Sequence, residues 1–168
     1  MGASIVLLAL AAAISGQVQS SACAPDCRTE IRATIRPDKA TAGQPGRYFL
    51  GIFPVHEGRP VFHVGGYFDG RDWVVSERPV AFTARPVGPV NVRATVRQGV
   101  CARARAAGAQ YTRFVVAAGY GIDTVAAADR EAGQDSGEAL DEATRDQIAA
   151  VSMIQGGTYQ IVGEVVCE

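Results

Sequence analysis

Short β-rich segments follow one another along most of the chain, from residue 28 to about residue 121. In the first of them, Ile31, Ala33 and Ile35 alternate with charged and polar residues, a period of two that predicts one buried and one exposed face. Further segments of this kind lie at residues 47–53, 60–68, 72–75, 80–84, 90–97 and 111–118. Glycine, proline and aspartate separate them, as is typical of turns. This succession predicts an all-β protein, and we expect an immunoglobulin-like antiparallel β-sandwich.

The pattern becomes helical after Asp123. Residues 124–132 predict a short helix, and Asp135 with Glu138 supplies a capping box for a second helix. A mostly apolar stripe at helical spacing then predicts the face of that helix that packs on the sheets. Its members are Leu140, Thr144, Ile148, Val151 and Ile154.

The chain length and this order of elements predict one domain. Residues 23–168 are enough for a single hydrophobic core, and alternation returns at 159–167 in what we expect to be the last strand. The helices would then form an insertion at 123–155, just before that strand. The Gly119-Tyr120-Gly121 sequence predicts a strand end where another backbone approaches closely.

The start of the chain is typical of an export signal. Ile5 to Ile14 is an uninterrupted run of ten apolar residues, shorter than the roughly 20 needed to span a bilayer and matching the central part of a secretory signal peptide. The residues before it carry no Lys or Arg, which departs from the usual positively charged start. We expect a signal peptide at 1–22 and a periplasmic or extracellular protein without a membrane span. Lipid anchoring through Cys23 is one alternative, and a retained membrane anchor or a buried helix is the other.

Four cysteines in an exported chain predict two disulfides. Three pairings are possible, and we favour Cys23 with Cys27 and Cys101 with Cys167. A zinc site is the competing use of the first pair, but that pair has no matching second pair, and neither histidine lies near a cysteine in the sequence. We therefore expect no metal and no other cofactor.

Seven of the twelve aromatic residues fall within 26 positions, from Tyr48 to Trp73. Neighbouring aromatics such as Tyr67 and Phe68 point to opposite faces of a regular strand, so some of them would be exposed. Exposed aromatic side chains bind partner proteins, peptides or sugars. The surface we expect to bind a partner consists of Tyr48, Phe62, Tyr67 and Trp73. The alternative is that all of these residues belong to the core.

Charge is divided sharply along the chain although its formal net value is only −1. Residues 78–122 hold seven arginines and no acid, whereas 123–146 hold eight acids and two arginines. Arg93 and Arg97 share one face of a predicted strand, which makes them candidates for an anion-binding site. Because the charges nearly cancel, we favour the other interpretation, in which the acidic helices cover this basic face.

His56 and His63 lie on either side of a predicted hairpin turn. If that turn brings them together, Asp69 or Asp72 could complete a metal site, although nothing in their spacing is diagnostic.

Signals for catalysis are weak. No Gly-x-Ser-x-Gly sequence is present. Acidic residues are common, but their spacing in the sequence does not identify a catalytic pair of carboxylates. We expect an exported, non-enzymatic binding or assembly component of the bacterial cell envelope, of the pilus, adhesin or secretion accessory type. Its partner would be another envelope or surface protein, not a nucleic acid. The alternatives are a periplasmic protein that binds a small ligand or metal, and a small envelope hydrolase.

Overall fold

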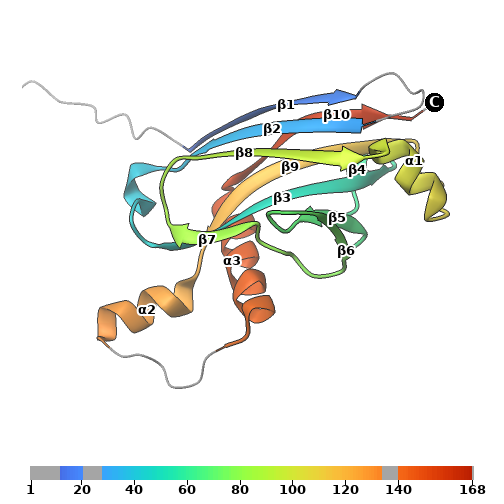
Figure 1. Ribbon diagram of the computed structural model, residues 1–168. Helices are drawn as coiled ribbons and strands as arrows, with labels where there is room; N and C mark the ends of the chain where they lie inside the picture. Colours follow the sequence, from blue (N-terminus) through green and yellow to red (C-terminus); the bar gives the residue numbers. More distant parts are fainter. Residues whose placement is uncertain (1–11, 21–27, 134–139, 168) are drawn as a thin grey trace, which may run out of the picture.

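Two antiparallel β-sheets form the body of the protein (Figure 1). The computed structural model describes residues 12–20, 28–133 and 140–167. The smaller sheet has the strand order β1-β2-β8, and the larger sheet follows β10-β9-β3-β5-β6, with β4 and β7 also paired to β3. The strands are β1 (Ala13–Ser20), β2 (Arg28–Arg36), β3 (Pro45–His56), β4 (Arg59–Pro60), β5 (Gly65–Phe68), β6 (Trp73–Ser76), β7 (Thr83–Pro86), β8 (Val90–Arg97), β9 (Arg113–Ile122) and β10 (Tyr159–Val166). The predicted mostly-β class with antiparallel sheets is confirmed, whereas the immunoglobulin-like connection of the strands stays a prediction.

The main hydrophobic core lies where side chains of the two sheets meet. Residues two apart on a strand share a face, and Ile31 and Ile35 of β2 accordingly point inward and are fully buried. Tyr48, Leu50 and Val116 of the larger sheet belong to the same cluster and are also fully buried. The alternation read from the sequence therefore marks the inner faces of β2 and β8 correctly.

Strand β1 lies within the segment that the sequence predicts to be a signal peptide. It pairs with β2 along its whole length, and Ile14 is only 7% exposed within the main core. β1 and β10 approach so closely that a Cβ atom at Gly16 would lie 2.8 Å from the Cβ of Val162. Removal of residues 1–22 would therefore take away a complete strand and part of the core. The cleavage of a signal peptide at that position stays a prediction.

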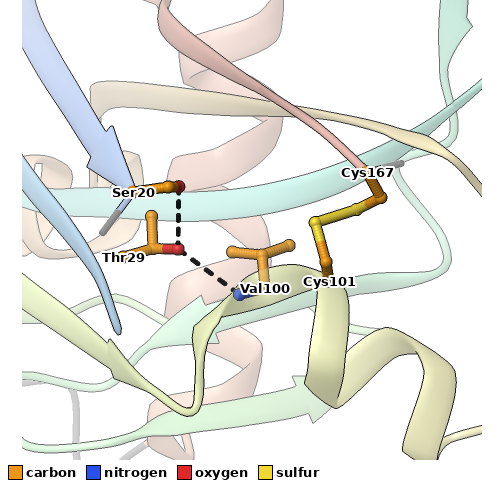
Figure 2. Close-up of a disulfide and its surroundings, with 5 residues drawn as sticks. All are labelled: Ser20, Thr29, Val100, Cys101 and Cys167. Atoms are coloured by element: carbon orange, nitrogen blue, oxygen red, sulfur yellow. Dashed lines mark hydrogen bonds between the residues drawn. A yellow bond between two sulfur atoms is a disulfide. The ribbon is translucent and has the colours of Figure 1, made fainter. Parts of the chain in front are cut away.

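A disulfide joins the end of β10 to a helix that the sequence does not predict (Figure 2). Helix α1 (Gly99–Ala106) follows β8 directly, and its Cys101 is bonded to Cys167, with their Cα atoms 5.5 Å apart. This pairing is the one that the sequence analysis favours. The other predicted pair, Cys23 and Cys27, lies outside the described residues.

Beside this disulfide, Thr29 ties three elements together (Figure 2). Its hydroxyl lies 3.2 Å from the hydroxyl of Ser20 at the end of β1. It also accepts a hydrogen bond of 3.4 Å from the backbone N–H of Val100 in α1. A buried hydroxyl needs such partners, and these contacts position α1 at the edge of the smaller sheet.

Two further helices, α2 (Thr124–Ala132) and α3 (Glu142–Gly156), lie between β9 and β10 in the chain. The side chain of Asp123 caps α2, and that of Asp141 caps α3 by accepting a 2.7 Å hydrogen bond from the N–H of Thr144. The predicted capping box at 135–138 lies outside the described residues.

The apolar stripe predicted to pack α3 on the sheets does not do so. Val151 and Ile154 are exposed, and the buried residues of α3 are Asp146, Ala149 and Ala150. The prediction is wrong because small side chains and a carboxylate, not large apolar ones, fit the surface that α3 meets.

Candidate functional site

A buried arginine holds α3 against the larger sheet. Nη1 of Arg47 on β3 donates hydrogen bonds of 2.7 Å to Oδ1 of Asp146 and to Oε2 of Glu142, and its Nε lies 3.5 Å from Oδ2 of Asp123. Burial acts to lower the pKa of Arg47, but the hydrogen bonds to Glu142 and Asp146 raise it above its usual value. The hydrogen bond from Arg47 lowers the pKa of Glu142. A buried charge needs such partners, so this cluster determines where α3 begins on the sheet.

Glycines on β9 allow α3 to lie very close to that strand. A Cβ atom at Gly121 would collide with the backbone of Ala149, and one at Gly119 would lie 2.6 Å from Sδ of Met153. The close backbone approach predicted at residues 119–121 is confirmed. α3 and β9 therefore meet through small residues, and a space lined by both elements lies beside this contact.

That space is an apolar cavity of about 340 Å³ between α3, the outer face of the larger sheet and the loops that follow β4 and β6. Its sheet side includes the small residues Gly51, Ala117 and Gly119. The α3 side is formed by Ala150, Met153 and Ile154. The volume falls within the range of small-molecule sites in proteins.

Aromatic rings form another wall of the cavity. The ring centroid of Phe53 lies 4.9 Å from that of Phe62 and 5.4 Å from that of Tyr67, both edge to face. Tyr159 of β10 lies 6.4 Å from Phe62 in the same geometry. Burial raises the pKa of Tyr67, so its hydroxyl stays protonated at neutral pH. These walls suit a ligand held by apolar contact and ring edges.

The aromatic residues expected to form a partner surface do not form one together. Tyr48 is 0% exposed, and its hydroxyl donates a 2.6 Å hydrogen bond to the carbonyl of Gly88. Tyr67 is buried beside the cavity and Trp73 is half-buried, whereas Phe62 is 45% exposed. The prediction is wrong for Tyr48 and Tyr67, because the sheet that carries them is covered on both faces.

Arg93 and Arg97 lie on the exposed outer face of β8. The helices α2 and α3 lie on the opposite side of the molecule and pack on the larger sheet (Figure 1). The interpretation that acidic helices cover these arginines is therefore wrong. The acids Asp123, Glu142 and Asp146 bind Arg47 instead.

The two histidines take separate roles. The imidazole of His56 lies edge to face against Tyr111, with ring centroids 6.4 Å apart, whereas His63 lines the cavity. Asp69 accepts hydrogen bonds from the backbone N–H groups of Arg71 and Asp72, which orders the turn between β5 and β6. Within residues 12–20, 28–133 and 140–167, no three His, Cys, Asp or Glu side chains lie close enough to hold a metal ion.

Sequence reasoning missed the contacts that hold α3 against the larger sheet beside the cavity. Arg47 and Asp146 are 99 positions apart, so no local pattern connects them. A signal was present on β9, where Ala117, Gly119 and Gly121 place only small residues on one face of a strand. Such a face allows another element to pack closely or leaves space for a ligand.

No helix within the described part of the chain has the length and apolar character required to cross a membrane.

Comparison of this chain with protein family models, with curated proteins and with solved structures finds no match.

Proposed function

We propose that this protein is a non-enzymatic binding component of the bacterial cell envelope, and that it holds a small apolar molecule in the cavity beside α3. The observation that carries the proposal is the cavity of about 340 Å³ itself, whose lining is dominated by carbon. Burial of apolar surface in such a site contributes roughly 25 cal/mol per Å². A ligand of modest size can therefore bind without any charged contact.

The shape of the walls indicates the class of ligand. The ring of Phe53 covers Gly51, and Met153 and Tyr159 cover Gly119, so a ligand would lie against these side chains and not on the strand backbone. Phe62 and Tyr67 each stack edge to face on Phe53, so three rings line the cavity together. His63 and Glu77 are exposed at the margin, where they could meet a polar end of the ligand. An aromatic or polycyclic compound with one polar end fits this arrangement.

The proposed location in the cell envelope is supported by the disulfide and by the start of the sequence, and not by the cavity. The disulfide between Cys101 and Cys167 is typical of proteins in oxidising compartments. The apolar run at the start of the chain agrees with export. We also propose that the protein assembles with another envelope protein, as expected from the sequence. The exposed ring of Phe62 supports this, because it offers a contact for a partner.

Titration with N-phenyl-1-naphthylamine tests the cavity directly, because this uncharged dye fluoresces more strongly in apolar surroundings. We expect saturable binding to one site per chain. Ile154→Ala removes part of the α3 wall and should weaken binding about fivefold, the effect of roughly 1 kcal/mol of lost apolar contact. Ala117→Leu should reduce binding further, because it fills the space next to the sheet.

Ile161→Ala is the matched control for Ile154→Ala. Both isoleucines are largely exposed, at 62% for Ile154 and 53% for Ile161, but Ile161 lies on β10 and does not line the cavity. Neither change should alter stability much. Equal dye affinity in the wild type, Ile154→Ala and Ala117→Leu proteins would show that the dye binds elsewhere. Independently of the dye, mass spectrometry of a solvent extract from the purified protein can identify a natural ligand.

A further inference from the structure

We propose that the outer face of the smaller sheet binds a linear acidic polysaccharide. We call this surface the arginine face; its charged members, all on β2 and β8, are Arg28, Glu30, Arg32, Arg36, Arg93 and Arg97. On the described strands β2 and β8, five positive charges thus share one face with a single carboxylate. The arginine face lies on the side of the molecule opposite α3 (Figure 1). It is a second site, independent of the cavity.

The strand register places arginines directly opposite each other. Arg32 lies opposite Arg93, and Arg28 lies opposite Arg97. Like charges in facing positions of neighbouring strands destabilise a sheet. These pairs therefore work against folding, and a bound anion would remove the repulsion between them.

One carboxylate is shared among three of these arginines. An oxygen of Glu30 lies 3.3 Å from Nη2 of Arg93, and the corresponding closest distances are 3.7 Å for Arg28 and 3.8 Å for Arg32. The three arginine side chains are 58 to 63% exposed. Exposed ion pairs of this kind are weak, and each guanidinium has five N–H donors. The exposed guanidinium groups of Arg32 and Arg93 therefore have donors beyond those that face Glu30, and these can reach an external anion.

The dimensions of the arginine face suit an extended chain. Arg28, Arg32 and Arg36 follow one another at four-residue intervals, about 13 Å apart, so the row is about 26 Å long. The row on β8 runs beside it at about 5 Å. The surface is long and narrow, and guanidinium groups match carboxylate and sulfate in paired hydrogen bonds.

Neutral side chains around the arginines favour a sugar polymer over other polyanions. Thr34, Asn91 and Thr95 lie between the arginines, and Gln17 and Gln19 extend the surface onto β1. These side chains can exchange hydrogen bonds with sugar hydroxyls. The outward positions of β1, β2 and β8, as described, carry no ring that could stack on a base and no large apolar group that could enter a bilayer.

Fluorescence anisotropy with a labelled heparin octasaccharide and a labelled polygalacturonate fragment tests this surface on the full chain. Both should bind, with an affinity that falls steeply between about 50 and 200 mM salt. Arg32→Ala with Arg93→Ala removes one facing pair and should weaken binding at least about tenfold. Arg59→Ala with Arg71→Ala removes the same charge from exposed positions elsewhere. This control should change the affinity by less than about twofold.

The remaining outcomes separate the alternatives. Absence of binding to both glycans, or equal losses in the two double variants, would overturn the proposal. So would tighter binding to phosphatidylglycerol vesicles or to single-stranded DNA. Arg32→Gln should leave the melting temperature of the free protein unchanged or higher, because it removes one of two facing charges. A fall of more than about 5 °C would assign the arginines a structural role instead.

Discussion

Replacing Ile14 tests whether β1 belongs to the mature protein. Its side chain is 7% exposed and packs in the main core. Ile14→Ala removes three carbon atoms, worth about 2.4 kcal/mol at roughly 0.8 kcal/mol each, and leaves a small cavity that adds to the loss. If the predicted cleavage after residue 22 does not remove β1, the free energy of unfolding should fall by about 2–3 kcal/mol. For a chain of this size, the melting temperature should fall by roughly 6–9 °C.

The protein is purified as it accumulates in cells, and its intact mass is measured first. Urea denaturation then gives the free energy of unfolding. Ser15→Ala is the control, because this neighbouring side chain points outward and is exposed, and it should stay within about 0.5 kcal/mol of wild type. Gly16→Ala should be severe, because the new Cβ would lie 2.7 Å from the carbonyl oxygen of Arg32. If Ile14→Ala has no effect and the mass shows loss of residues 1–22, β1 is absent from the mature fold and our reasoning on the core is refuted.

Three further predictions concern the disulfide and the arginine that holds α3. Replacing Cys101 and Cys167 with serine should lower the free energy of unfolding by about 4 kcal/mol, from the chain entropy of their 66-residue separation, and urea curves with no shift would contradict this. Asp146→Ala should cost about 3–5 kcal/mol in the same assay, because it removes a carboxylate partner from buried Arg47; a loss below about 1 kcal/mol would show that the other carboxylates suffice. The folded pKa of Glu142 is lowered by Arg47, so its stabilisation is present above the unfolded value near 4.5 and is lost as pH falls through the folded value. Glu142→Gln should therefore unfold with a smaller difference between neutral and acidic pH than wild type, and equal pH dependence would refute this role.

The sequence by itself determined the mostly-β class of the fold, and it left three cysteine pairings open, one of which we favoured. Alternation along β2 and β8 is a local property, since neighbouring residues on a strand point to opposite faces. It marks the buried residues Ile31 and Val92 without knowledge of what covers them. The favoured pairing of Cys101 with Cys167 is the one that the tertiary structure contains.

The tertiary structure alone decided which surfaces are covered and where the cavity lies. The periodicity of a helix predicts that it has an apolar face. Which face of α3 packs on the larger sheet, however, depends on the glycines of β9 and on Arg47 of β3. Gly121 meets Ala149, and Arg47 meets Asp146, across separations in the chain that no local pattern spans. Segregated charge likewise did not reveal that the acids bind one buried arginine and leave Arg93 exposed. Contacts between distant segments depend on the geometry of the whole fold. Complementary shapes and charges pack favourably only when the fold brings those segments together.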